Sequence, residues 1–158
     1  MKLSNKINNQ TIILPLNSIC KNEVMHELLD HFYKMNYLTS TVKLFSYLDN
    51  QDKEFNSASG RGVAFHYHTS IEITDTLAVL GISKQGIDYS ASDGLLCHFI
   101  LLILEPKDVP DIHRKYIRLF QDMIKDVSIK EELLQSSSSL EVEEIIKIWE
   151  EKTINNML

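Results

Sequence analysis

Cysteine is scarce in this chain, whose 158 residues include only Cys20 and Cys97. Two thiols are too few for the disulfide framework of a small secreted protein. Both stand among apolar neighbours, which predicts buried free thiols in a reducing compartment. Long apolar runs are also missing, and residues 1–10 lack the apolar core of a signal peptide. We therefore expect a cytoplasmic protein without membrane insertion.

An excess of basic residues is absent too, because 22 acidic residues outnumber 16 basic ones and the net charge is −6. Binding to nucleic acid is not expected, since it depends on clustered Lys and Arg against phosphate. A basic protein surface is a better electrostatic match for a partner. The length predicts one compact domain over residues 1–158, with its core at about residues 3–151. Such a chain needs no metal or cofactor to fold.

Helical and strand patterns follow one another in an order typical of an α/β protein. Apolar spacing, proline positions and S-x-x-E capping boxes predict helices over residues 21–35 and 41–48 and helices that begin near 111, 128 and 138. Alternating or continuous apolar runs predict strands over residues 62–66, 76–83 and 97–104. The polar segment 49–59 is expected to end the second helix. This order predicts a mixed β-sheet covered by helices.

His66 and His68 stand two residues apart near the end of the first predicted strand. If the strand continues through them, both imidazoles lie on one face of the sheet and Tyr67 lies on the other. Paired histidines are common zinc ligands, but zinc needs a third ligand, and H-E-x-x-H and C-x-x-C motifs are absent. His113 or a carboxylate would have to supply it. The alternative is that both are half-exposed edge residues bonded to backbone.

His113 falls in the first turn of the helix predicted from residue 111. Free N–H groups and the positive end of the helix dipole favour an anion such as phosphate there. The same field disfavours an imidazolium ion, so a neutral His113 that binds oxyanions is expected. The alternative is an exposed residue at a helix start, without a special role.

Five segments, in this order and spacing, resemble motifs of one family. They are SICKNEVMHELLDHF (18–32), QDKEFNS (51–57, against R-E-K-x-x-S-T), GVAFHY (62–67, against G-[IV]-A-[IV]-P-H), QGIDYSASDGLLCH (85–98, against E-G-I-D-F-x-A-x-D-G-x-P-V-H) and PDIHRKYIRL (110–119, against P-x-x-x-H-L-x-x-L-x-R-L). The chain thereby resembles the IIA domains of the fructose, mannitol and nitrogen-regulatory branches of the bacterial phosphotransferase system, over nearly its whole length.

The resemblance implies a fold and a function. The implied fold is the single-domain IIA fructose/mannitol type, in which helices cover both sides of a mixed sheet. The implied function is phosphoryl transfer, in which a histidine at the end of the first strand accepts phosphate from an HPr-type phosphocarrier protein. A IIB domain or a regulatory target would be the next partner. In this resemblance His113 matches the family's second histidine, which steadies the phosphoryl group.

The family's acceptor histidine has two possible counterparts here. An alignment without gaps places Tyr67 at the acceptor position and Gln51 at a family arginine that neutralises phosphate. One inserted residue places His68 there instead, with Thr69 as a small polar neighbour. We expect His68 to be the acceptor, with His66 as the reserve.

Further site residues are expected from the same resemblance. His113 is predicted to stabilise the phosphoryl group, and Arg61 to replace the missing cation. Tyr67 and Thr69 are predicted to lie beside the phosphate.

Three functions remain open at this point. The preferred function is a IIA-type protein of the regulatory, nitrogen-regulatory kind, because no IIB, IIC or HPr-like segment accompanies the domain. The second is a non-phosphorylated protein-interaction module with Tyr67 at the acceptor position. The third is a metal-binding domain built from His66, His68 and His113.

Overall fold

The fold comes from a computed structural model that describes residues 1–109 and 111–157. The strands are β1 (Ile12–Ile13), β2 (Ala58–Gly60), β3 (Val63–Thr69), β4 (Leu77–Ile87) and β5 (Cys97–Glu105). The helices are the short 3-10 helix η1 (Leu3–Asn5), α1 (Lys21–Lys34), α2 (Val42–Glu54), α3 (Ile112–Ile124), α4 (Val127–Gln135) and α5 (Ser139–Met157). None of these helices is both long enough and apolar enough to cross a membrane.

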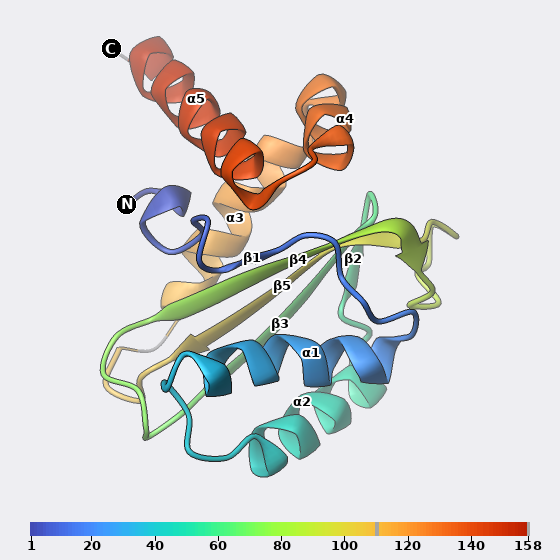
Figure 1. The fold of residues 1–158 in the computed structure, drawn as a ribbon, viewed down its shortest axis with the longest axis vertical. Helices are drawn as coiled ribbons and strands as arrows, with labels where there is room; N and C mark the ends of the chain where they lie inside the picture. The colour runs from blue at the N-terminus through green and yellow to red at the C-terminus, as the bar shows by residue number, and fades with distance from the viewer. Residues whose placement is uncertain (110, 158) are drawn as a thin grey trace.

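The five strands form one mixed sheet in the order β1-β4-β5-β3-β2. β3 runs parallel to β5, and β4 runs antiparallel to it. Figure 1 shows α1 and α2 on one side of the sheet and α3, α4 and α5 on the other. The predicted fold class, a mixed sheet covered by helices on both sides, is confirmed.

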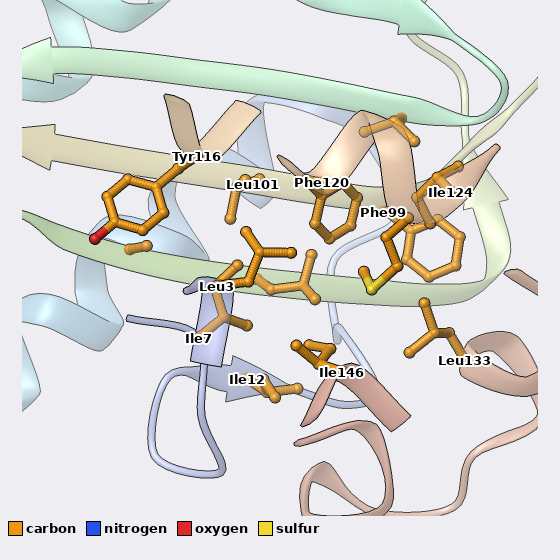
Figure 2. Packing of buried hydrophobic residues seen from close by; sticks show 14 of the residues in the cluster. Leu3, Ile7, Ile12, Phe99, Leu101, Tyr116, Phe120, Ile124, Leu133 and Ile146 are labelled. Atoms are coloured by element: carbon orange, nitrogen blue, oxygen red, sulfur yellow. The ribbon is translucent and has the colours of Figure 1, made fainter. Parts of the chain in front are cut away.

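Successive residues of β5 face opposite sides of the sheet and enter two separate cores. Phe99, Leu101 and Ile103 pack toward α3 and α5, in the cluster that Figure 2 shows around Phe120. Ile100 and Leu102 pack toward α1 and α2 instead. Both faces of β5 are buried, which explains why its sequence reads as an uninterrupted apolar run.

Several predicted boundaries are corrected by the structure. α2 continues to Glu54 instead of ending at residue 48, since most of its later polar residues face solvent, Asp49 pairs with Lys53 at 3.1 Å, and the buried Asp52 pairs with Lys21. α4 is capped by the Asp126 carboxylate, which accepts two backbone N–H groups, and not by Ser128. β1 and β2 were not expected, because two or three residues are too short to show a pattern.

The prediction for the cysteines is half right. Both thiols are free, and Cys97 is buried in the core, where burial raises its pKa to about 11. Cys20 is exposed, and it stands at the N-cap of α1, before the first turn of that helix.

A buried carboxylate joins the two ends of the chain. Glu150 in α5 is only 6% exposed, and its oxygens accept bonds from the Ser4 backbone N–H at 2.9 Å and the Ser4 hydroxyl at 2.6 Å. Hydrogen bonds to charged acceptors contribute about 1.5–3 kcal/mol each when a partner is removed. We expect Glu150→Ala to lower the free energy of unfolding in urea by about 2 kcal/mol. The neighbouring exposed Glu151→Ala should change it little, and equal losses in both variants would contradict this role for Glu150.

Candidate functional site

Two parallel strands end at the same edge of the sheet, and α3 begins beside them. β3 and β5 pair in register, so Tyr67 lies opposite Ile103 and Thr69 lies opposite Glu105. Strand ends of parallel neighbours gather side chains at one edge, which is where α/β proteins commonly place their sites. The predicted strand therefore continues through residues 66–69, and its side chains alternate between the two faces as expected.

On the face covered by α3, Tyr67 lies directly against His113. The two rings stack with 3.9 Å between their centroids and 11° between their planes. His113 is buried, 6% exposed, whereas Tyr67 remains 41% exposed. Tyr67 therefore covers the imidazole and is itself open to solvent. The alternative that His113 is an exposed helix-start residue is wrong.

Glu105 holds both the start of α3 and the ring of His113. Its carboxylate accepts the His113 backbone N–H at 3.0 Å and the Nδ1–H at 2.7 Å. The anion at this helix start is thus the chain's own carboxylate, which satisfies a free N–H of the first turn. Because a carboxylate only accepts, Nδ1 holds a proton, and in the neutral ring the lone pair lies on Nε2.

His68 lies on the opposite face of the sheet, against α2. Its ring stacks on Tyr47 with a centroid separation of 4.9 Å and 7° between the planes. Its Nδ1 donates to the Thr69 carbonyl at 2.7 Å, which again leaves Nε2 with the lone pair in the neutral ring. Lys43, Lys107 and Thr69 line the same cavity of about 670 Å³ as His68. The expectation that His68 and His113 converge on one phosphate is therefore contradicted, because the sheet lies between them.

His66 is part of a buried polar cluster on the α1/α2 side. Its Nε2 lies 2.9 Å from the Tyr89 hydroxyl, and its Nδ1 lies 3.3 Å from the Ser57 hydroxyl. Burial lowers the pKa of His66 from 6.5 to about 4, with the Asp52 charge opposing the shift and the Lys21 charge adding to it. His66 is therefore a neutral residue of the interior that is poorly placed to meet a partner protein.

A partly buried ion pair completes this cluster. Lys21 Nζ lies 2.6 Å from Asp52 Oδ2, and Asp52 Oδ1 accepts the Ser57 backbone N–H at 3.1 Å. Burial by itself raises the pKa of Asp52, but the hydrogen bonds from Lys21 and Ser57 outweigh it and leave the pKa below its ordinary value. The cluster fixes the segment that leads from α2 into β2.

Arg61 does not lie with the other predicted site residues. It stands in the turn between β2 and β3, at the end of β3 opposite to Tyr67. Four steps of extended strand lead from Val63 to Tyr67, which is about 13 Å at ~3.3 Å per residue, and Arg61 lies two residues before that strand. Among the described residues no three His, Cys, Asp or Glu side chains are grouped as metal ligands, and His113 is separated by the sheet from His66 and His68.

A cavity of about 500 Å³ lies beside Tyr67, between the end of α2, β2, β3 and α3. Its lining includes Gln51, Phe55, Ser57 and Ile117, together with Tyr67. Gln51 is thus a neutral residue in the same depression as the exposed phenol.

The comparisons with known proteins identify the family of this fold and site. Residues 5–148 match the family model described as phosphoenolpyruvate-dependent sugar phosphotransferase system, EIIA 2. The chain belongs to this family. The resemblance inferred from the sequence motifs is therefore confirmed.

Individual relatives are distant. The chain is 22% identical over 146 residues to the fructose-specific EIIABC component of the phosphotransferase system of Bacillus subtilis, and it spans 23% of the length of that protein. It shares the fold of the nitrogen regulatory protein IIA-Ntr from Neisseria meningitidis, with a TM-score of 0.74, 18% identity and coverage of 91% and 98% of the two chains. It also shares the fold of IIA mannitol from Escherichia coli, with a TM-score of 0.73, 18% identity and coverage of 89% and 99%.

Sequence reasoning did not find Glu105, Tyr47 or the residues that surround His66. Glu105 had one visible signal, an acidic residue directly after an apolar strand and before Pro106. Tyr47 and Tyr89 gave no signal, because their contacts with His68 and His66 join segments that are distant in the sequence.

The lowered pKa of His66 predicts how stability depends on pH. An unfolded chain takes up this proton near pH 6.5, whereas the folded protein takes it up only near pH 4. The unfolded state therefore binds more protons in this interval, and stability is lost as the pH falls from 6.5 to 4, by about 3 kcal/mol at most. The low pKa of Asp52 acts in the same direction, but below its ordinary value of 3.8.

Urea unfolding of the wild type and His66→Gln at several pH values tests this expectation. We expect the variant to have the flatter profile between pH 6.5 and 4, because glutamine can hydrogen-bond but does not titrate. Parallel profiles would show that His66 is not the titrating group.

The stacking partners predict which histidine each tyrosine protects. Tyr67→Ala should raise the rate at which diethyl pyrocarbonate modifies His113 several-fold, because the ring that covers the imidazole is removed. Tyr47→Ala is the matched control, and it should raise the rate at His68 instead. Peptide mass mapping gives both rates, and an unchanged rate at His113 in Tyr67→Ala would contradict the arrangement.

Proposed function

We propose that this chain is a partner-binding IIA-type domain of the phosphotransferase system that holds no phosphohistidine at its strand-end position. The observation that supports this proposal is the stack of Tyr67 on His113 at 3.9 Å. His113 matches the family's second histidine, so the residue beside it occupies the acceptor position. That residue is a phenol.

The chemistry of a phenol differs from that of the acceptor imidazole. A phosphoryl group on an imidazole nitrogen is easily passed on, because the P–N bond is labile, whereas an aryl phosphate is a stable ester. A carrier also needs cations that neutralise the phosphoryl oxygens. Gln51, which lines the cavity beside Tyr67, offers an amide where the family has an arginine. Two features needed for transfer are thus replaced in one cavity.

The same region is well suited to contact with a protein. Phe55 is 78% exposed and Tyr67 41% exposed at the rim of this cavity, and aromatic residues are typical anchors of protein interfaces. We propose an HPr-type phosphocarrier as the partner. A IIB-type domain is the second choice. One solved structure of this fold is the complex of enzyme IIAMTL with phosphorylated enzyme IIBMTL from Escherichia coli.

Transfer through His68 is the second candidate function. One observation favours it: the Nδ1–H bond to Thr69 directs the lone pair to Nε2, in a cavity that Lys43 and Lys107 also line. An imidazole with a free Nε2 and two nearby ammonium groups has the parts that a phosphoryl acceptor requires. It lacks a second histidine.

Incubation with a phosphorylated HPr-type carrier separates the two candidates. We expect the intact mass at alkaline pH, where phosphohistidine survives, to show no added phosphoryl group on the wild type. We also expect binding to the carrier, measured by calorimetry, to weaken about tenfold or more in Tyr67→Ala and in Phe55→Ala, as for anchor residues of an interface. Tyr33→Ala, which removes an exposed tyrosine of α1, is the matched control and should bind as the wild type does.

Each contrary outcome has a distinct meaning. A mass gain that His68→Gln abolishes would replace the proposal by transfer through His68. A mass gain that survives acid and is lost in Tyr67→Phe would show a phosphate ester on Tyr67. Absence of both mass gain and binding would contradict an HPr-type partner.

A further inference from the structure

A second cavity, of about 420 Å³, lies between the β2–β3 turn and the second half of α3. Three of its lining residues are cationic, namely Arg61, Arg118 and Lys125. Ser59 and Gln121 add a hydroxyl and an amide to the lining. Its volume falls within the range of small-molecule sites, about 300–1,000 Å³. The established family membership and the proposed partner binding do not use this cavity.

The turn presents Arg61 in an unfavourable backbone conformation. Gly60, Arg61 and Gly62 have φ values of 94°, 60° and 79°, all in the region that favours glycine. An arginine there costs roughly 1–2 kcal/mol relative to its usual conformations. The chain thus has a large cationic side chain where glycine would fit without strain, and such strain is typical of functional positions.

Contacts from two other segments hold this turn in place. The Arg61 backbone N–H donates to Asp93 Oδ2 at 2.9 Å, and Lys130 Nζ donates to the Arg61 carbonyl. Both backbone groups of Arg61 are therefore occupied, which fixes the origin of its side chain at the cavity. A guanidinium on a fixed backbone loses less conformational freedom when it binds an anion.

The charges of the cavity are not balanced within the described residues. Asp122 is the carboxylate of the lining, and it lies 3.5 Å from Lys125. The guanidinium groups of Arg61 and Arg118 form no ion pair with a described residue. Two guanidinium groups that line one cavity repel each other, and a doubly charged anion between them removes this repulsion and accepts their parallel N–H donors.

The arginine cavity adjoins the cavity beside Tyr67, since Ser59 and Gln121 line both. In the cavity beside Tyr67, Phe65 and Ile117 form an apolar part of a lining that also holds polar residues such as Gln51 and His66. We propose that the two cavities bind a small organic phosphate monoester, with its phosphate between Arg61 and Arg118 and its organic part over Phe65 and Ile117. The bound ligand would lie next to the surface proposed to bind the partner protein. Partner binding would then depend on the concentration of a phosphorylated metabolite.

Amide NMR of the full chain tests this site with glycerol 3-phosphate as the probe, and with glycerol plus potassium chloride at equal ionic strength as the reference. We expect saturable shift changes at residues 59–63 and 117–125. Arg61→Gly and Arg118→Ala should each weaken binding about tenfold or more, the usual loss for a charged hydrogen-bond partner. Arg114→Ala is the matched control, because Arg114 is an exposed arginine of the same helix that does not line the cavity.

Arg61→Gly also separates binding from folding. Glycine adopts the φ of position 61 without strain, so this variant should unfold at the same or a higher urea concentration than the wild type while losing the ligand. Unchanged affinity in Arg61→Gly would overturn the proposal, and so would shift changes confined to residues around Lys43, His68 and Lys107. If the wild type bound inorganic phosphate as tightly as glycerol 3-phosphate, the organic part of the ligand would have no role in binding, which would overturn the proposal of a monoester. None of these outcomes depends on whether position 67 accepts phosphate, so the two proposals fail separately.

Discussion

The parallel pairing of β3 with β5 decides the composition of the candidate site. The pairing runs without a slip from Val63 to Thr69, and it places each side chain of β3 on a definite face. A slip of one residue would move Phe65 out of the core near Phe120 and turn Ala64 toward α3, so the register is fixed by apolar packing. Because the side-chain period is two, Tyr67 meets His113 and His68 does not.

Glu105 links this pairing to the start of α3. It is the last residue of β5, only 2% exposed, and it binds both the backbone and the ring of His113. A buried carboxylate without such partners would destabilise the fold by several kcal/mol. The hydrogen bonds between Glu105 and His113 therefore hold the end of β5 to the start of α3. The orientation of His113 is thus set before any ligand is present, and the stack with Tyr67 follows from it.

The sequence was sufficient for the fold and for part of the site. Period-two alternation correctly separated Tyr67 from His66 and His68, and the apolar run of β5 correctly indicated burial on both faces. The side of the sheet that α3 covers could not be predicted from local patterns, since it depends on how the chain passes from β5 to α3. That choice decided whether His113 would face Tyr67 or His68. The position of Arg61 likewise depends on a turn whose three positive φ values are not apparent from the sequence.

Protein stability constrains Tyr67 less than it constrains His113 and Glu105. Tyr67 is 41% exposed and stacks its ring on His113, so residue 67 can be exchanged at small cost to packing. His113 and Glu105 are buried and satisfy each other, so the loss of either leaves an unpaired polar group in the interior. Stability therefore constrains His113 and Glu105 independently of any function. It places no such constraint on residue 67, and a phenol there is compatible with an intact fold.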